Sequence, residues 1–306
     1  MIFIKPNFWK KKNLIVYFLL PFTLVTEFIN ILKKFSSAKA PKIKTICVGN
    51  IYLGGTGKTP LVIKINEILK KKFNTYVIKK YYSNQVDEQN LLKKKTKLIL
   101  PKTRSEGISK LIKVKKSLAI LDDGLQEKNI KYQISVVCFN SLSGIGNGFV
   151  LPAGPLRENL SELRNYNAAF INGKRNKILE SKIKLYNPNI KLFRGNYIIK
   201  DKKKFDMGLK YLAFCGIGSP ENFFTLLKKN KIKVNKKLVF PDHYKYQKKD
   251  INKIKEIAFT NKLEIITTEK DYTKIKNFKK FKTNVARIDL RIEKPVLFKN
   301  FLLKNL

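Results

Sequence analysis

The sequence predicts an α/β protein with a phosphate-loop (P-loop) domain whose mostly parallel sheet carries helices on both faces. A smaller C-terminal α/β domain and an N-terminal membrane-associated helix are expected to complete it. Three observations support this prediction: a glycine-rich turn between a strand and a helix, alternating strand and helix patterns on both sides of residue 200, and an apolar run near the start. The expected domains are residues 1–34, 35–199 and 200–306.

Residues 45–60 read TICVGNIYLGGTGKTP and contain the glycine turn. Its glycines allow positive φ angles, so backbone N–H groups can surround phosphate oxygens, and the helix N-terminus adds partial positive charge. Lys58 is expected to reach the β- and γ-phosphates, and Thr59 to ligate Mg²⁺. Tyr52 stands where a full GxxxxGK[ST] motif has its first glycine. The alternative to a phosphate-binding loop is an ordinary strand–helix turn. The expected nucleotide-binding residues are Gly54, Gly55, Thr56, Gly57, Lys58 and Thr59.

The composition is strongly basic, with a formal net charge of +43 in 306 residues. Charge alone would suggest a nucleic-acid binder, but the lysines are spread along the whole chain and only seven basic residues are Arg. We therefore expect no nucleic-acid partner, and interpret the charge as favouring an anionic membrane face or a phosphorylated substrate. The three cysteines lie in apolar runs without metal spacing, which is typical of core residues in a reducing compartment.

The apolar run near the start covers Asn13 to Leu32, 20 residues, which is about one bilayer span. Three residues are unfavourable in a lipid-exposed span: Pro21, Glu27 and Asn30. The segment could instead lie in the membrane interface, anchored by Trp9, Tyr17 and the flanking lysines. A core helix of a soluble domain is the third alternative. Membrane association is preferred, and spanning or lying flat is left open.

Strand and helix patterns alternate from Lys44 to Tyr197, as in a parallel sheet. Expected strands are 45–49, 75–79, 97–100, 117–121, 134–139, 168–172 and 192–199, and expected helices are 58–72, 86–94, 105–115 and 159–165. Residues 200–208 are expected to form a charged linker. The second α/β unit is expected to contain a strand in KYLAFC, helix 220–230, strand 237–240, helix 248–261, strand 263–267, strand 284–289 and helix 295–304.

Two acids, Asp122 and Asp123, follow the apolar strand 117–121. Acids at this position beside a phosphate loop usually hold the metal, directly or through water. Adjacent strand residues point to opposite faces, so one of the two is expected to face Mg²⁺. An Asp-Asp-Gly surface turn is the alternative.

Two further segments are candidates for function. Residues 144–158 are rich in Gly and Pro yet carry apolar side chains, which indicates an ordered functional loop ending in Arg157 and Glu158, although this pair could equally be a surface pair. His243 follows an acid in a polar turn, so a functional role is favoured over a structural hydrogen bond. In residues 268–271, TEKD, the Lys adjoins the Asp, which gives no support for guanine recognition.

Six motifs occur in an order that resembles the tetraacyldisaccharide 4′-kinase family of lipid A biosynthesis. They are VGNIYLGGTGKTP, LDDGLQ, GNGFVLPAGPLRE, FCGIGSPENFF, FPDHYKY and TTEKDYTK, and the resemblance covers most of the chain. It implies a two-domain kinase on the cytoplasmic face of the inner membrane. Such an enzyme transfers the γ-phosphate of ATP, with Mg²⁺, to the 4′-hydroxyl of a tetraacylated glucosamine disaccharide 1-phosphate. No obligate protein partner is expected.

The resemblance also implies roles for residues that match the family motifs. Asp87 would activate the acceptor hydroxyl, His243 would pair with Asp87, and Lys58 would act on the transferring phosphate. Asp123 and Gln126 would contact the nucleotide. Thr59, Asp122 and Glu158 would hold the metal, and Arg104 and Arg157 would contact substrate.

The sequence departs from the family pattern in four places. The family's SRGYG is KKYYS at 79–83, its GDE begins with Val86, the histidine usual after its DDGFQ is Glu127, and its Phe there is Leu125. These differences affect the expected backbone near 80–88 and the charge near the metal.

A phosphoryl-transfer mechanism further predicts that the two domains close over the substrate, with residues 200–208 as part of the hinge. The main alternative function is a membrane-associated nucleotide-switch protein without lipid kinase activity, which would use the same phosphate loop to drive a partner.

Overall fold

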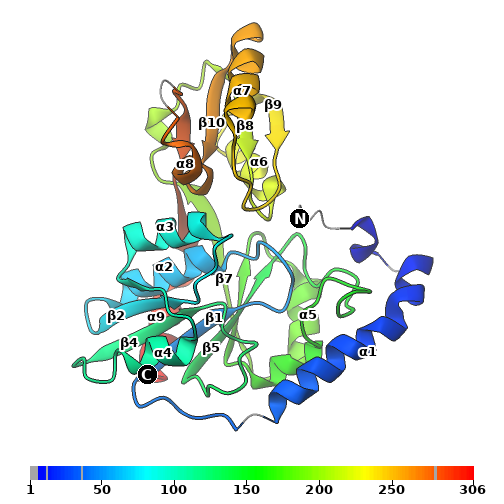
Figure 1. Cartoon of the computed structure of the whole chain (residues 1–306), viewed down its shortest axis with the longest axis vertical. Coiled ribbons are helices and arrows are strands. Elements are labelled where there is room, and N and C mark those ends of the chain that lie inside the picture. Colours follow the sequence, from blue (N-terminus) through cyan, green and yellow to red (C-terminus); the bar gives the residue numbers. More distant parts are fainter. Residues whose placement is uncertain (1–5, 12, 36, 279–280) are drawn as a thin grey trace. The chain divides into compact units, whose positions relative to one another are not determined.

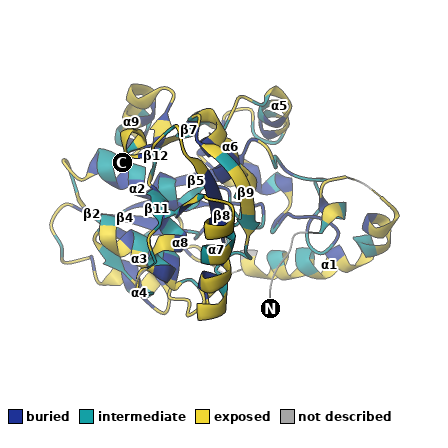
Figure 2. Cartoon of the chain, turned by 90° about the horizontal axis from the view of Figure 1, so that it is seen from above, coloured by how far each residue is buried: buried dark blue, intermediate teal, exposed yellow. Residues whose placement is uncertain are grey.

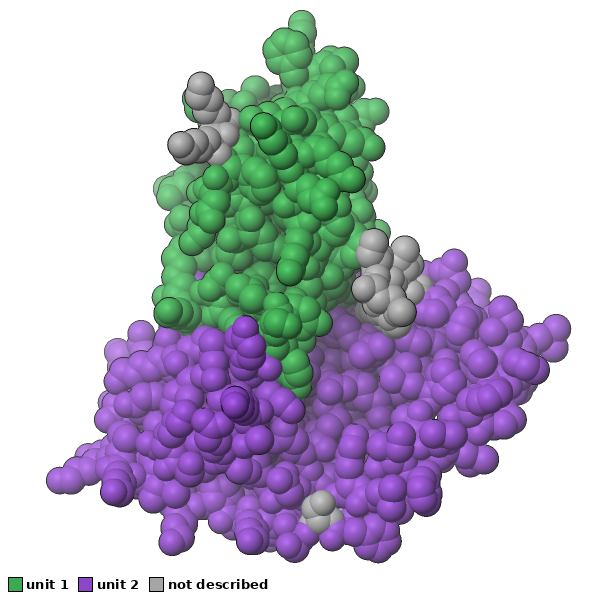
Figure 3. Space-filling model, viewed as in Figure 1, with its two compact units in different colours: residues 1–4, 82–94, 197–289 green, residues 5–81, 95–196, 290–306 purple. Residues whose placement is uncertain are grey.

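The computed structural model describes residues 6–11, 13–35, 37–278 and 281–306. The chain forms two compact units (Figure 3). The large unit contains, among the described residues, 6–81, 95–196 and 290–306, and the small unit contains 82–94 and 197–289.

The large unit is built on an eight-stranded sheet in the order β12-β7-β6-β5-β1-β4-β2-β3 (Figure 1). From β7 to β3 every neighbouring pair is parallel. Since β1 and β4 are neighbours, with Val48 opposite Asp122, the glycine turn after β1 and the acids after β4 share one edge of the sheet. The strands are β1 (Lys44–Gly49), β2 (Asn74–Lys79), β3 (Leu98–Ile99), β4 (Ser117–Asp122), β5 (Ile134–Asn140), β6 (Ala168–Asn172), β7 (Lys191–Ile199) and β12 (Ile288–Ile292).

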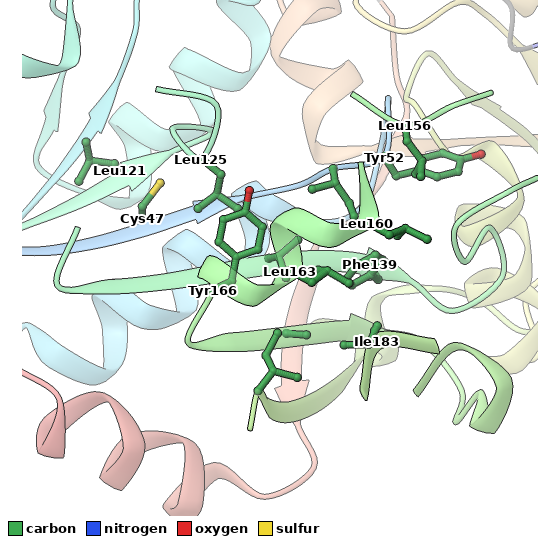
Figure 4. Packing of buried hydrophobic residues seen from close by; sticks show 14 of the residues in the cluster. Cys47, Tyr52, Leu121, Leu125, Phe139, Leu156, Leu160, Leu163, Tyr166 and Ile183 are labelled. Atoms are coloured by element: carbon green, nitrogen blue, oxygen red, sulfur yellow. The ribbon is translucent and has the colours of Figure 1, made fainter. Parts of the chain in front are cut away.

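Helices cover both faces of this sheet, which confirms the predicted fold class. On one face, α4 (Arg104–Ser109), the 3₁₀ helix η2 (Leu160–Asn165) and α5 (Lys177–Tyr186) share a buried cluster with the strands (Figure 4). On the other face, Phe298 of α9 (Pro295–Lys304) packs edge-on against Phe170 of β6, with ring centroids 5.8 Å apart. The helix α2 (Lys58–Leu69) follows the glycine turn and contacts β1, β2 and β4.

The small unit has a four-stranded parallel sheet in the order β11-β10-β8-β9. Alternate residues of β8 enter two clusters: Ala213 packs with α6, and Phe214 packs with α7. The strands are β8 (Lys210–Cys215), β9 (Lys233–Val239), β10 (Glu264–Thr268) and β11 (Asn284–Ala286), and the helices are α3 (Val86–Lys95), η3 (Lys202–Lys204), α6 (Pro220–Lys229), α7 (Lys248–Thr260) and α8 (Glu269–Ile275). The three cysteines, at 47, 138 and 215, are free and buried, as expected.

The division into units differs from the domain ranges expected from the sequence. Residues 82–94, expected in the P-loop domain, group with the small unit, and residues 290–306, expected in the C-terminal domain, group with the large unit. The reason is packing, since Phe298 of the last helix is buried against the large sheet. Residues 200–208 are not a linker, because Phe205 belongs to the buried core of the small unit. The chain passes between the units next to residues 81, 94, 196 and 289, whereas residues 200–208 lie entirely within the small unit.

Several element boundaries also differ from the predictions. The helices α5 and α8 were not expected, although Asn176 caps the first through Leu179 N and Thr268 caps the second through Asp271 N. The helix expected at 105–115 ends at Ser109, β9 begins at Lys233, and the strand expected at 284–289 is divided into β11 and β12.

The apolar N-terminal segment forms the helix α1 (Leu14–Lys34), which is long enough and apolar enough to span a membrane. Only a narrow stripe of it packs on the large unit, including Val16 and Thr23. The polar residues Glu27 and Asn30 lie on that stripe: Asn30 Nδ2 donates to Arg157 O at 2.9 Å, and Glu27 Oε1 accepts from Asn159 Nδ2 at 3.3 Å. The rest of the helix exposes large apolar side chains (Figure 2): Leu14, Ile15, Tyr17, Phe18, Phe22, Leu24, Val25, Phe28, Ile29, Ile31 and Leu32.

This exposure rules out the core-helix alternative. Trp9, however, is not a lipid anchor as expected. Its indole is 5% exposed and donates to Pro152 O at 3.1 Å, and Asn147 N donates to Trp9 O at 2.8 Å. The Gly- and Pro-rich loop 144–158 therefore binds Trp9, close to the start of α1, through two hydrogen bonds.

Candidate active site

The glycine turn has the backbone that its sequence predicts. Gly54 and Gly57 have φ angles of 108° and 91°, a region that L side chains rarely adopt. Gly57 is the N-cap of α2, so Lys58 and Thr59 are the first two residues of the helix, where free N–H groups and the helix dipole favour an anion. The described turn is thus suited to hold phosphate.

Asn50, at the start of the loop after β1, organises the charged groups beside this turn. Its Oδ1 accepts hydrogen bonds from Lys58 Nζ and from an Arg157 guanidinium nitrogen, each at 3.0 Å. Its Nδ2 donates to Gly54 O at 3.1 Å. The same guanidinium nitrogen of Arg157 lies 2.8 Å from Asp123 Oδ1, and Lys58 Nζ lies 3.6 Å from Asp123 Oδ2. The structure thereby brings together Lys58, Asp123 and Arg157, which come from three different segments.

Asp123 has a φ of 60°, in the left-handed region that Asp tolerates better than most residues. Burial by itself raises the pKa of its carboxyl group. The charges of Lys58 and Arg157 and the hydrogen bond from Arg157 outweigh burial, so the pKa of Asp123 lies below its ordinary value. Asp123 is therefore an anion in a site whose other members are cations.

Asp122 is fully buried, and its Oδ2 lies 2.9 Å from Nζ of Lys79, whose side chain is only 4% exposed. The pair follows from the sheet, because Lys79 of β2 is directly opposite Asp122 of β4. The other carboxylate oxygen of Asp122, Oδ1, has no hydrogen-bond partner among the described residues. Lys79 occupies one of the positions that depart from the family's SRGYG.

This buried pair predicts a stability effect. Lys79→Met leaves the Asp122 carboxylate buried without its cation and should lower the unfolding free energy by about 3–5 kcal/mol. Adding Asp122→Asn should recover part of the loss. Denaturant unfolding followed through Trp9, the single tryptophan and a residue of the large unit, measures both. A Lys79→Met protein as stable as the parent would show that the pair contributes little.

Gln126 and Glu158 lie together behind this cluster. Gln126 Nε2 donates to Asn50 O at 3.0 Å and to Glu158 Oε2 at 2.8 Å. Tyr166 OH also donates to Glu158 Oε2, and Lys128 Nζ lies 2.7 Å from Oε1. Both oxygens of Glu158 are thus engaged by protein groups, which fixes the loop that carries Arg157.

Arg104 is 4% exposed and holds the turn after β4 from behind. Its guanidinium donates to the carbonyl oxygens of Asp122 and Asp123 and pairs with Glu127. Glu127 is the residue that replaces the family histidine. The expected contact between Arg104 and substrate stays a prediction, since the contacts within the chain do not test it.

The small unit brings together the other two predicted catalytic residues. Asp87, 5% exposed, lies in the first turn of α3, and His243 follows β9 with a left-handed φ of 59°. His243 Nδ1 and Asp87 Oδ1 are 2.8 Å apart. An ionised carboxylate only accepts hydrogen bonds, so Nδ1 carries the proton and donates. The pair joins residues 156 positions apart in the sequence.

Cations from α8 surround this pair. Lys274 Nζ lies 3.3 Å and Lys270 Nζ 3.6 Å from Asp87 Oδ2. Burial raises the pKa of Asp87, but the hydrogen bond from His243 and the charges of Lys270, His243 and Lys274 together lower it below its ordinary value. Asp87 is therefore ionised at neutral pH, as a general base must be.

A cavity of about 280 Å³ adjoins the pair. Its walls combine the titratable Asp87 and His243 with amide and hydroxyl side chains and two lysines. They are formed by Ser83, Asn84, Val86, Asp87, Asn90, His243, Lys245, Tyr246, Thr273 and Lys274. Such a lining offers several hydrogen-bonding groups that could orient a ligand beside Asp87.

Among the described residues, no group of three or more His, Cys, Asp and Glu side chains could hold a metal ion. Mg²⁺ needs less, because it commonly takes one or two carboxylates together with substrate phosphates and water. The unpartnered, buried Oδ1 of Asp122 and the hydroxyl of Thr59 are oxygen donors of the kind that Mg²⁺ prefers. These residues fit the ion, and Glu158 fits less well, because its oxygens are already engaged.

Sequence reasoning missed several residues of these sites: Asn50, Lys79, Lys128, Lys270 and Lys274. Asn50 could have been found, because a polar residue between a buried strand and the glycine turn lies at the edge where ligands bind. The four lysines could not, because they are among 58 lysines that are spread along the whole chain.

The parallel sheet, the glycine turn before α2 and the acids after β4 define a nucleotide-binding protein of the P-loop class. The sequence profile of the tetraacyldisaccharide-1-P 4′-kinase family matches residues 14–306. The chain belongs to this family.

Relatives in this family are similar in sequence to the chain along almost its whole length. The tetraacyldisaccharide 4′-kinase of Pelagibacter ubique (strain HTCC1062) is 44% identical over 305 residues, covering 98% of this chain and 97% of the relative. That of Rickettsia bellii (strain OSU 85-389) is 33% identical, covering 88% and 89%. In fold, the chain is similar to LpxK from Aquifex aeolicus in complex with ATP, with a TM-score of 0.69 and 23% identity over 95% of this chain and 99% of that one.

Proposed function

We propose that the protein is a tetraacyldisaccharide 4′-kinase, which transfers the γ-phosphate of ATP to the 4′-hydroxyl of a tetraacylated glucosamine disaccharide 1-phosphate. Family membership and the phosphate-binding turn support the nucleotide half of this activity. The observation that carries the acceptor half is the Asp87–His243 pair, which lies beside a cavity whose walls include several hydrogen-bonding side chains. A nucleotide-switch protein needs no general base of this kind.

The proposed step is an in-line transfer. The acceptor hydroxyl oxygen forms a bond to the γ-phosphorus, and the bond from that phosphorus to the β–γ bridging oxygen breaks, releasing ADP. Asp87 accepts the hydroxyl proton late, because in a loose transition state the bond from the hydroxyl oxygen to phosphorus is little formed and the hydroxyl has gained little positive charge. His243 orients Asp87 through its Nδ1 proton.

The large unit supplies charge and position for the nucleotide. Lys58 and the N–H groups of the turn hold the β- and γ-phosphates, and Arg157 and Asp123 complete the site, with Gln126 fixing the loop that carries Arg157. Thr59 and Asp122 would hold Mg²⁺, with Glu158 as the third predicted ligand. When bound, the ion would neutralise charge on the phosphate oxygens. Since the two groups of residues belong to different units, we propose that the units close over both substrates during transfer.

The direct test incubates the full chain with γ-labelled ATP and the tetraacylated disaccharide 1-phosphate in detergent. We expect label in the lipid product and none without the acceptor. ATP hydrolysis that a protein partner stimulates, with no labelled lipid, would instead establish the nucleotide-switch alternative. Salt-sensitive binding to any duplex would be the outcome for a nucleic-acid binder.

We further propose that α1 lies in the interface of the anionic inner membrane, on its cytoplasmic face. Its polar stripe, with Glu27 and Asn30, is bound to the large unit, and its exposed apolar side is available to lipid. The flanking Lys10 and Lys11 are suited to anionic headgroups. This orientation explains why residues unfavourable in a membrane span occur in the helix.

A vesicle-flotation experiment checks the membrane proposal. The full chain should float with vesicles containing anionic lipid, and a Phe18→Glu/Phe28→Glu variant should stay largely in the soluble fraction, because these two side chains are 74% and 61% exposed on α1. Phe259→Glu is the matched control, since Phe259 is 88% exposed on α7 of the small unit. Equal flotation of all three proteins would contradict a role for α1.

A further inference from the structure

Lys274 of α8 is held rigidly beside Asp87. Its Nζ lies 2.9 Å from Asp271 Oδ1 and donates to Gly216 O at 3.2 Å. It also lies 5.5 Å from the ring centre of Tyr246. Contacts from several directions leave this flexible side chain little freedom, and its exposed fraction is 11%.

Asp271, the anchor of Lys274, is itself completely buried and fixed. Its Oδ1 accepts from Tyr246 OH at 3.0 Å, and its Oδ2 accepts from Thr268 Oγ1 at 2.7 Å. The backbone N–H of Asp271 in turn donates to Thr268 Oγ1 at 3.0 Å. The Lys274 ammonium group thus has anchors of its own, in Asp271 and Gly216, besides its contact with Asp87.

The neighbouring Lys270 has different partners. Its Nζ is 2.9 Å from Asp242 Oδ1 and 3.1 Å from Glu88 Oε1, both closer than its 3.6 Å distance from Asp87 Oδ2. Its charge is therefore shared with two other carboxylates. Lys274 is the nearer cation to Asp87 Oδ2, and that oxygen makes no hydrogen bond among the described residues.

We propose that Lys274, anchored by Asp271, is a positioning residue for the reaction: it places a positive charge 3.3 Å from Asp87 Oδ2, while His243 contacts Oδ1, and so holds the carboxylate beside the cavity. The proposal rests on the proposed function for its kinetic consequence. The structural part, an electrostatic coupling between Lys274 and Asp87, stands independently of it.

The coupling between Lys274 and Asp87 predicts the direction in which the pKa of Asp87 changes when Lys274 is replaced. The titratable groups around Asp87 are His243 and Asp242 from the segment after β9, Lys270 and Lys274 from α8, and Glu88 from α3 itself. Removing one nearby cation destabilises the carboxylate relative to the carboxylic acid, so the proton is retained to higher pH. Lys274→Met should raise the pKa of Asp87 by about 1–2 units.

The test is a ¹³C NMR titration of the full chain labelled at the Asp side-chain carboxyl carbons, with the Asp87 signal assigned by its loss in Asp87→Asn. We expect the midpoint to move to higher pH in Lys274→Met and in Lys274→Gln, whose amide can still bind Asp271. Lys274→Arg should titrate like the parent, as should Lys276→Gln, a surface change just beyond α8. An unchanged midpoint in Lys274→Gln would overturn the proposal.

Kinetics provide the second readout. In Lys274→Gln we expect kcat to fall about tenfold or more with the KM for ATP unchanged, because the nucleotide residues lie in the other unit. The loss should be larger at pH 5 than at pH 8, since Asp87 would begin to protonate. A parent protein that phosphorylates no lipid would contradict the proposed function, whereas the NMR midpoint still decides the coupling.

Discussion

Lys58→Ala is expected to reduce lipid phosphorylation roughly 10³-fold or more, because Lys58 would act on the transferring phosphate itself. Lys58 is the first residue of α2, with its Nζ bound to Asn50 Oδ1 at 3.0 Å beside Asp123. In the proposed site its charge would lie beside the γ-phosphate as that group leaves ADP. Removing it takes away an interaction that strengthens in the transition state, so kcat should fall more than the affinity for ATP.

Single-turnover measurements with labelled ATP separate the two effects of this change. Lys71→Ala is the matched control, because Lys71 is exposed just after the same helix and should leave the rate unchanged. A Lys58→Ala enzyme that binds ATP weakly but turns over normally at saturation would show that Lys58 serves binding alone. Near-normal kcat and KM together would remove the glycine turn from the proposed site.

Asp87→Asn is expected to lower kcat by about 10²–10⁴-fold, the usual contribution of a positioned general base. The amide is nearly isosteric, but it cannot accept the hydroxyl proton. ATP affinity should stay unchanged, because Asp87 belongs to the small unit and the phosphate-binding turn belongs to the large one. This split between binding and turnover distinguishes a lost base from a misfolded protein.

The measurement pairs calorimetric ATP binding with the rate of lipid phosphorylation. Asp206→Asn is a suitable control, because Asp206 is a surface residue of the same small unit. If Asp87→Asn keeps nearly full turnover, the base must be another group, and the cavity beside His243 loses its assigned role. Weakened ATP binding with unchanged kcat would likewise contradict the assignment.

The phosphate-binding half of the site was readable from the sequence because its residues are neighbours in the chain. Gly54, Gly57, Lys58 and Thr59 lie within six positions, and their backbone requirements are local. Asp122 and Asp123 were found as acids at the end of a strand. The residues that pair with these acids, Lys79 and Arg157, were not found as their partners. They lie far from the acids in the sequence, and only the folded chain brings them into contact.

The small unit shows the same limit more clearly. Resemblance to the family connected Asp87 with His243, and the structure supports that pairing with a 2.8 Å contact. Nothing in the spacing of TTEKDYTK identified a helix whose lysines surround Asp87. The helix depends on the Thr268 cap, and the meaning of Lys274 depends on a residue 187 positions earlier in the numbering.

By itself the sequence determined the fold class, the phosphate-binding turn, the buried cysteines and the apolar helix near the N-terminus. All of these follow from local periodicity, glycine conformation and the side chains of a single segment. Tertiary structure alone decided which charged side chains pair and which side of α1 is bound to protein. It also decided that residues 82–94 belong to the small unit and residues 290–306 to the large unit. These depend on contacts between segments far apart in the chain, and the free energy of such contacts is set by packing and burial that no single segment encodes.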